Sequence, residues 1–243
     1  MKIIKLDTIG STNSFLKELN ANSKVENYTI VVSKNQTSGR GQMNTSWHSE
    51  DGKNLIFSIL VRFEDLLITK QKYLNYAISI SVFETLKYYN LPEVSIKWPN
   101  DILSEKNKIV GILIENSLRL NKISSSIIGI GMNVNQEFFP ENIPNPSSLK
   151  LKTGLDFNLD EVLKVFFNFL NNAIELLNQN QFEVLEEKYL NVLYKKNVPS
   201  VFKTNQDEIF KGEIVGISPE GKLQIELSNM NIKEFGLKEV SFA

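Results

Sequence analysis

A change of pattern late in the chain constrains its fold more than any other feature of the sequence. In the earlier part, apolar residues repeat at helical spacing over residues 70–89 and 159–178, which predicts two amphipathic helices. The apolar run at 54–63 predicts a strand that is covered on both faces. The later part contains only short alternating runs between turn residues, which is typical of small β-barrels. We therefore expect an α+β domain over residues 1–194 and a small β domain over residues 195–243.

Shorter patterns complete the expected α+β domain. A helix is expected after Ser11 or Thr12, either of which can cap it, and a short helix is expected to end near residue 190. The remaining strands of this domain are expected at residues 2–6, 28–34, 93–98, 108–115 and 124–135. The short strands of the β domain are expected at residues 200–203, 209–217, 222–227 and 232–236.

Composition and charge exclude several classes of function. The chain has 243 residues, with 27 Lys and Arg against 28 Asp and Glu, so it has no electrostatic footprint for nucleic acid and no basic anchor for a membrane. It contains no cysteine, which excludes disulfides, thiolate nucleophiles and cysteine metal sites. The opening apolar run is too short for a signal peptide, and none reaches the roughly 18 residues of a membrane span. We expect a cytoplasmic protein that binds neither nucleic acid nor membrane.

The segment VSIKWPNDILSEKNKIVGILIE, residues 94–115, predicts a strand, a polar turn and a return strand. Pro99 fixes its own φ, and the Asn and Asp that follow it bond readily to nearby backbone groups. Lys97 closes the first strand and Lys108 opens the second. On spacing alone, an exposed hairpin with two solvated lysines remains the simplest interpretation.

The segment QTSGRGQMNTSWHSEDGKNL, residues 36–55, has no apolar period and surrounds Arg40 and Trp47 with glycines. It contains the only histidine, His48, so a histidine-based catalytic triad would have to use this residue. Glycine allows a backbone to approach a ligand closely. The segment is therefore either a flexible surface loop or a device that holds a ligand.

Four motifs in one order resemble those of the biotin protein ligases: STN, then QTSGRGQ with a following GKNL, then KWPNDI with K-x-x-G-I-L-x-E, then GIGMNVN. The resemblance covers essentially the whole chain. It implies a mixed β-sheet flanked by helices, as in the catalytic domains of class II aminoacyl-tRNA synthetases and biotin synthetases, with a small C-terminal SH3-like β-barrel. Because STN begins at residue 11, we expect the short form without an N-terminal DNA-binding domain. Homodimers occur in the family, so a homodimer is one expected assembly.

The resemblance also implies an activity. The family activates biotin with ATP to biotinyl-5′-AMP, and then transfers the biotin to a lysine of a biotin carboxyl carrier domain. Three cations would be catalytic: Lys108, which bridges the biotin carboxylate and the phosphate, Arg40 near both groups, and Lys97 near the nucleotide. Mg²⁺ is expected to arrive with ATP, held by phosphates and water, so no metal site is expected on the protein.

Matching positions give the expected binding residues. Hydroxyl and amide groups of STN suit the ureido ring of biotin, glycines line the floor beneath it, and Trp47 offers a flat face to adenine. The biotin set is Ser11, Thr12, Asn13, Gln36, Gly39, Arg40, Gly41, Gln42, Lys108, Gly111, Gly129 and Gly131. The ATP and adenylate set is Arg40, Gln42, Trp47, Asn54, Lys97, Asn100, Lys108 and Asn133.

The chain departs from the family in its loop. Gln42 and Thr45 stand where arginines are frequent, Asn44 replaces a glycine, and Gly10 stands where an acidic residue is common. Gln42 can still donate a hydrogen bond but brings no charge, so the retention of the adenylate is open. A lipoate or octanoate ligase or transferase of the same fold is the alternative enzyme, although its R-R-x-x-G-G-G-x-V-x-H-like stretch is absent. A non-catalytic biotin-binding module is the alternative of another class.

Overall fold

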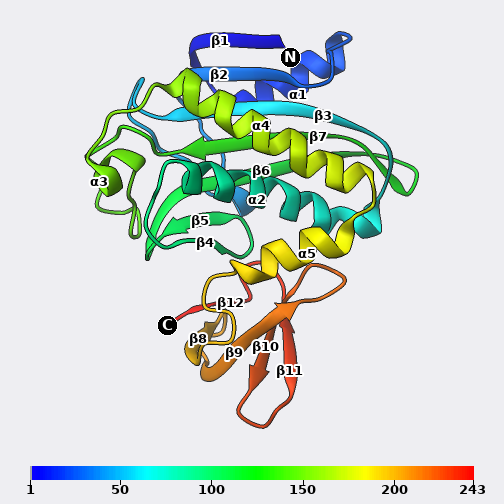
Figure 1. Ribbon diagram of the computed structural model, residues 1–243, viewed down its shortest axis with the longest axis vertical. Coiled ribbons are helices and arrows are strands. Elements are labelled where there is room, and N and C mark those ends of the chain that lie inside the picture. The colour runs from blue at the N-terminus through cyan, green and yellow to red at the C-terminus, as the bar shows by residue number, and fades with distance from the viewer. Residues whose placement is uncertain (1) are drawn as a thin grey trace.

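The computed structural model describes residues 2–243 and is built on a seven-stranded sheet (Figure 1). Its strands follow the order β1-β2-β3-β7-β6-β5-β4, in which β1 and β2 are parallel and every other pair is antiparallel. The mixed sheet expected from the sequence is therefore confirmed. The strands are β1 (Lys2–Ile9), β2 (Thr29–Gln36), β3 (Leu55–Leu67), β4 (Val94–Lys97), β5 (Asp101–Ser104), β6 (Asn107–Arg119) and β7 (Lys122–Met132).

Helices cover both faces of this sheet because its central strands bury side chains on both sides. In β3, Phe57 and Ile59 belong to the core shared with α2 (Gln71–Tyr88) and α4 (Leu159–Asn178), where Phe57 meets Phe166 edge to face. Leu60 points the other way, because side chains alternate along a strand, and it packs against Leu16 of α1 (Thr12–Asn22). Both amphipathic helices predicted from periodicity are confirmed.

The starts of α1 and α4 follow the capping rules. The Ser11 hydroxyl accepts a hydrogen bond from the backbone N–H of Ser14, and Asn158 caps α4 in the same way. The short helix expected near residue 190 is α5 (Phe182–Asn191). Its Tyr189 stacks on Tyr76 of α2 at 4.1 Å between ring centroids. Burial raises the pKa of both phenols, so these side chains stay neutral. The stacked rings join α5 to α2.

The hairpin expected over residues 94–115 is wrong in its pairing. β5, which the sequence pattern did not reveal, lies between the two predicted strands, so β4 pairs with β5 and β5 pairs with β6. The missed strand is only four residues long and begins inside the polar WPND turn, where an apolar alternation cannot develop. The short helix α3 (Leu149–Thr153) was likewise not expected.

The C-terminal residues form a second, antiparallel sheet in the order β11-β10-β9-β8-β12, drawn in orange and red below α5 (Figure 1). This sheet is consistent with the expected SH3-like domain, and the domain boundary after residue 194 stays a prediction. Phe202, Phe210 and Phe235 stack within it. The strands are β8 (Ser200–Thr204), β9 (Ile209–Ile217), β10 (Leu223–Leu227), β11 (Ile232–Phe235) and β12 (Val240–Phe242), of which β12 was not expected.

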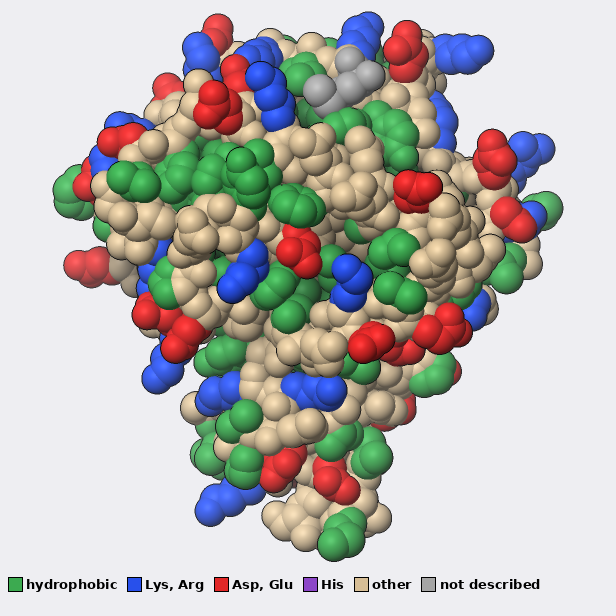
Figure 2. All heavy atoms as spheres, viewed as in Figure 1, with side chains coloured by type: hydrophobic (Ala, Val, Ile, Leu, Met, Phe, Trp, Pro, Cys, Tyr) green, Lys and Arg blue, Asp and Glu red, His purple; other side chains and the backbone are tan. Residues whose placement is uncertain are grey.

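The surface agrees with the balanced charge of the chain. On the face shown in Figure 2, Lys and Arg side chains are interspersed with Asp and Glu, without a large region of one sign. Within residues 2–243, every helix is too short or too polar to pass through a bilayer.

Candidate active site

A cavity of about 490 Å³ brings most of the predicted site residues together, between the seven-stranded sheet, the loop that follows β2 and the C-terminal sheet. We call residues 37–54, between β2 and β3, the Arg40 loop. The predicted residues that line the cavity are Ser11, Thr12, Asn13, Gln36, Arg40, Gly41, Gln42, Trp47, Lys97, Asn100, Lys108, Gly111, Gly129 and Gly131. Gly39, Asn54 and Asn133 are not among its lining residues.

Glycines form the part of the floor on which Trp47 lies. Gly111 of β6 and Gly131 of β7 are directly opposite each other in the ladder. A Cβ atom at Gly111 would come within 2.9 Å of the Trp47 ring, and one at Gly131 would overlap it. Gly129 is equally close to the side chain of Asn13. These positions therefore require glycine, and Trp47 covers the floor that the sequence assigned to biotin.

Lys108 stands at the beginning of β6 beside an acidic partner. Its Nζ lies 2.6 Å from Oδ1 of Asp101, and both side chains are largely buried. A register shift in the β5–β6 pairing places Asp101 opposite Gly111 while Leu103 pairs with Lys108. The distance between the two charged atoms makes this contact an ion pair. Oδ1 of Asp101 is buried and has no hydrogen-bond partner in the described part of the chain. The sequence interpretation gave Asp101 only the role of ordering the turn.

The STN segment contributes a hydrogen-bonded polar cluster at the start of α1. The backbone N–H of Thr12 donates to Oε1 of Gln36 at 2.7 Å, and the Thr12 hydroxyl reaches the same oxygen at 3.1 Å. The hydroxyl of Ser58 in β3 lies 2.5 Å from Oδ1 of Asn13 and 2.7 Å from the hydroxyl of Thr12. Ser58 is fully buried and was missed, because a serine inside an apolar run carries no sequence signal.

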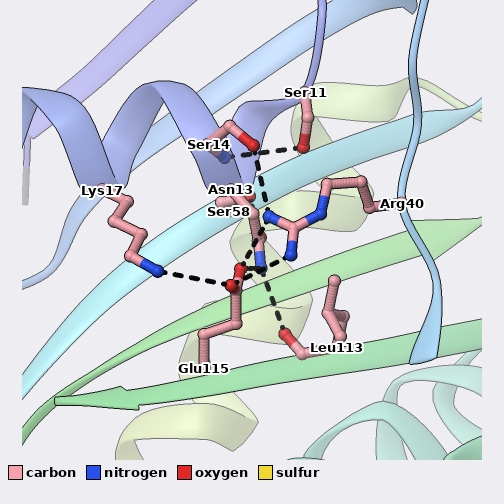
Figure 3. Close-up of polar contacts among 8 residues, drawn as sticks. All are labelled: Ser11, Asn13, Ser14, Lys17, Arg40, Ser58, Leu113 and Glu115. Atoms are coloured by element: carbon pink, nitrogen blue, oxygen red, sulfur yellow. Dashed lines mark hydrogen bonds and ion pairs between the residues drawn. The ribbon is translucent and has the colours of Figure 1, made fainter. Parts of the chain in front are cut away.

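Arg40 extends from its loop toward the carboxylate of Glu115 (Figure 3). Its Nη2 lies 3.2 Å from one carboxylate oxygen and its Nη1 lies 3.4 Å from the other, and Nη1 also donates to the hydroxyl of Ser14 at 3.2 Å. Asn13 donates to the same carboxylate at 2.9 Å, and Lys17 lies 3.8 Å away. Partial burial raises the pKa of Glu115, but Asn13, Arg40 and Lys17 outweigh it and hold the pKa below its ordinary value. Glu115 is therefore an ionised partner of the Arg40 loop.

The C-terminal sheet closes the cavity from the other side. Lys97 lies 5.7 Å from the ring of Phe242 in β12, and both line the cavity. Lys238, in the turn before β12, also lines it and donates a hydrogen bond to the carbonyl of Met43 in the Arg40 loop at 2.8 Å. The sequence interpretation assigned no residue of this sheet to the site, because nothing in short alternating strands indicates which neighbour they face.

The WPND turn is held from two sides. Trp98 donates from Nε1 to the carbonyl of Gly221, in a turn of the C-terminal sheet, at 3.1 Å. Asn100 donates to the carbonyl of Ile112 in β6 at 2.9 Å. Asn100 therefore lines the cavity and at the same time fixes the turn that carries Asp101.

The predicted residues outside the cavity make contacts within the protein. Asn54 accepts a hydrogen bond from the N–H of Val134 and donates to Gln136. Asn133 donates to the carbonyl of Ser147 at 3.0 Å, and its buried Oδ1 finds no partner among residues 2–243. Gly39 lies so close to the carbonyl of Trp47 that a side chain would overlap it.

With this geometry established, comparisons with known proteins identify the family. Residues 6–133 match the model of the biotin/lipoate A/B protein ligase family. The chain belongs to this family. The match covers the STN segment, the Arg40 loop, the WPND turn and the glycine floor.

Individual members of the family are similar over different lengths. The bifunctional ligase/repressor BirA of Bacillus spizizenii is 38% identical over 63% of this chain, and that match spans 47% of the relative's length. The chain thus spans about half the length of the curated relatives it matches first. The solved structure of biotin protein ligase from Aquifex aeolicus in complex with biotin and ATP is 30% identical, with a TM-score of 0.80, over 100% of this chain and 98% of that one. The R40G mutant of the same protein gives 29% identity and a TM-score of 0.79 over the same shares of both chains.

Proposed function

We propose that this protein is a biotin–protein ligase, which activates biotin with ATP to biotinyl-5′-AMP and transfers the biotin to a lysine of a carrier domain. One observation carries the proposal: the single cavity in which the STN segment, the Arg40 loop, the WPND turn and the glycine floor meet. The similarity to the Aquifex aeolicus ligase over nearly the full length of both chains supports it.

In the first step, an oxygen of the biotin carboxylate attacks the α-phosphorus of ATP. A new P–O bond forms, the bond to the β-phosphate oxygen breaks, and pyrophosphate leaves. Both reactants are anions, so cations must offset their repulsion. Arg40, Lys97 and Lys108 line the cavity and are proposed for this role. Because Lys108 lies 5.7 Å from the ring of Trp47, it stands beside the floor on which the biotin chain would rest.

In the second step, the amine of the carrier lysine attacks the acyl carbon of the adenylate. The C–N bond forms, the C–O bond to AMP breaks, and the amine gives up a proton. The adenylate must be shielded from water until the carrier arrives. Trp47 and the Arg40 loop on one side, and the C-terminal sheet with Phe242 on the other, are proposed to provide this shield.

The hydrogen-bonding groups of Thr12 and Asn13 suit the ureido ring of biotin, which offers one acceptor and two donors. Both are buried at the end of the cavity, where an unpaired polar group would be unfavourable. Ligand binding there must share these groups with Gln36 and Ser58, which already bond to them.

We propose that Mg²⁺ enters with ATP and not at a site of the protein. No group of three or more His, Asp or Glu side chains that could hold a metal ion occurs within residues 2–243. Asp101 is the one carboxylate among the residues that line the cavity, and it is paired with Lys108. When bound with ATP, Mg²⁺ would offset part of the charge of the phosphates; no step depends on a ligand from the protein.

The partner is proposed to be a biotin carboxyl carrier domain, because relatives from Mycobacterium tuberculosis and Paracoccus denitrificans are named biotin–[acetyl-CoA-carboxylase] ligases. A homodimer, a cytoplasmic location and the absence of nucleic-acid binding remain predictions. The second candidate is transfer of lipoate, since the matching family includes lipoate ligases.

The test is incubation of the purified protein with ATP, Mg²⁺ and an isolated apo-carrier domain, with biotin or with lipoate. We expect a mass increase of the carrier with biotin only, together with biotin-dependent release of pyrophosphate. Transfer of lipoate without transfer of biotin would favour the second candidate. Binding of biotin without pyrophosphate release would reduce the protein to a binding module.

A further inference from the structure

We propose that Glu115 is a positioning residue that couples the biotin side of the cavity to the Arg40 loop. Its carboxylate orients Asn13 and holds Arg40, and Arg40 exchanges this carboxylate for the negative charge of the bound ligand. The inference deepens the proposed function and rests on it for the identity of that ligand. Glu115 is the last residue of the K-x-x-G-I-L-x-E motif. The motif itself assigns no role to Glu115, and the proposed mechanism does not use it.

The carboxylate of Glu115 contacts Asn13 and Arg40 at the same time (Figure 3). Oε2 accepts from Nδ2 of Asn13 at 2.9 Å and from Nη1 of Arg40 at 3.4 Å, while Oε1 accepts from Nη2 of Arg40 at 3.2 Å. Asn13 belongs to α1, Arg40 to the loop after β2, and Glu115 to β6, so three separate segments meet at one group. A movement of Arg40 therefore changes the position of the Glu115 carboxylate, and with it the orientation of Asn13.

The pair is strong enough to hold the loop and weak enough to exchange. The side chain of Glu115 is 20% exposed and that of Arg40 is 46% exposed, so solvent screens the attraction. Pairs of this kind are worth a fraction of a kilocalorie to about 1 kcal/mol, which corresponds to about a fivefold change in an equilibrium. A carboxylate or phosphate in the cavity, away from bulk water, competes effectively for the guanidinium at that strength.

The decisive variant is Glu115→Gln, which keeps an oxygen for Asn13 but loses the charge that attracts Arg40. Without biotin, the amides of Gly41 and Trp47 report on the loop, because they donate to carbonyls within it. We expect them to exchange hydrogen about two- to fivefold faster in the variant, and at the wild-type rate with saturating biotin. Lys17→Met is the control, because it removes the other cation near Glu115 and Lys17 does not line the cavity. We expect the exchange rates of the two loop amides not to increase in this variant.

Binding measurements test the exchange of partners. By calorimetric titration, Glu115→Gln should bind biotin about two- to fivefold more tightly than wild type, because Arg40 no longer has to leave a carboxylate. Affinity for biotinamide, which has no negative charge, should stay at the wild-type value. In an Arg40→Ala background the substitution should have no further effect on biotin affinity. This cycle separates a path through Arg40 from a general change of the electric field.

Unchanged exchange of the loop amides in Glu115→Gln would overturn the positioning role. An equal gain for biotin and biotinamide, or a gain that persists in Arg40→Ala, would overturn the exchange of partners. If the wild-type protein binds neither compound, the proposed function fails together with the exchange of partners. The exchange rates measured without biotin still decide, independently, whether Glu115 holds the loop.

Discussion

Replacing Lys108 by Met tests the centre of the proposed mechanism, because the substitution removes one charge and keeps the length of the side chain. A charge about 3 Å from an anionic oxygen gains about 5 kcal/mol at an effective dielectric constant of about 20, before any desolvation is counted. Removal of single donors from comparable sites slows reactions about 10²- to 10³-fold. We therefore expect biotin-dependent pyrophosphate release to slow by about 10²- to 10³-fold in a single-turnover assay.

The ion pair with Asp101 complicates this substitution and also supplies its control. In Lys108→Met, the carboxylate of Asp101 loses its partner although its side chain is only 23% exposed. The free energy of unfolding should therefore fall by about 1–3 kcal/mol. Asp101→Asn in the same chain removes that charge. The double variant should regain the stability measured by thermal unfolding but not the rate. Wild-type pyrophosphate release in Lys108→Met, or recovery of the rate in the double variant, would refute the role assigned to Lys108.

Three further predictions follow from other contacts. Gly131→Ala places a Cβ atom in steric overlap with the ring of Trp47 on the floor of the cavity, so biotin affinity measured by titration should fall about tenfold or more. The pKa of Glu115 lies below its ordinary value of 4.5 in the folded protein, so its stabilisation is complete above about pH 4.5 and is lost as the pH falls through the lowered value, as thermal unfolding across pH would show. Trp98→Phe removes the hydrogen bond to Gly221 and should lower the free energy of unfolding by about 1 kcal/mol in denaturant titration.

The first two of these predictions have a control variant, and the third has an outcome that contradicts it. Gly10→Ala adds a methyl group where no atom lies within 4 Å of the new position, so it should leave biotin affinity near wild type. Glu115→Gln should flatten the acid limb of the stability curve, and an unchanged limb would contradict the assignment. An unaltered unfolding free energy in Trp98→Phe would mean that the bond between the WPND turn and the C-terminal sheet contributes nothing.

The fold was predictable where periodicity is long. The apolar residues of α2 and α4 repeat at helical spacing over several turns, and β3 contains a long apolar run. These three elements were therefore predicted with the correct type. β12 has only three residues, and the four residues of β5 begin inside the polar WPND turn, so neither strand shows an apolar period. Their existence depends on pairing with distant strands, which a local pattern does not contain.

The residues of the motifs could be predicted to lie in the candidate site, but the side chains that they contact could not. The motifs placed Lys108, Arg40 and the glycine floor in one cavity, but not the carboxylates beside the two cations. Asp101 and Glu115 became visible only when the register of β5 and β6 and the path of the loop were known. Charged residues are common on any surface, so sequence alone cannot indicate which of them point inward.

The chain contains two tryptophans, Trp47 and Trp98, and both line the cavity. One lies across the glycine floor, and the other bonds to the C-terminal sheet through its indole N–H. Their emission therefore comes entirely from the walls of this one chamber, without background from elsewhere in the protein. Selective excitation of tryptophan should make the unlabelled protein its own optical reporter of ligand entry, and Trp98→Phe leaves Trp47 as the sole tryptophan.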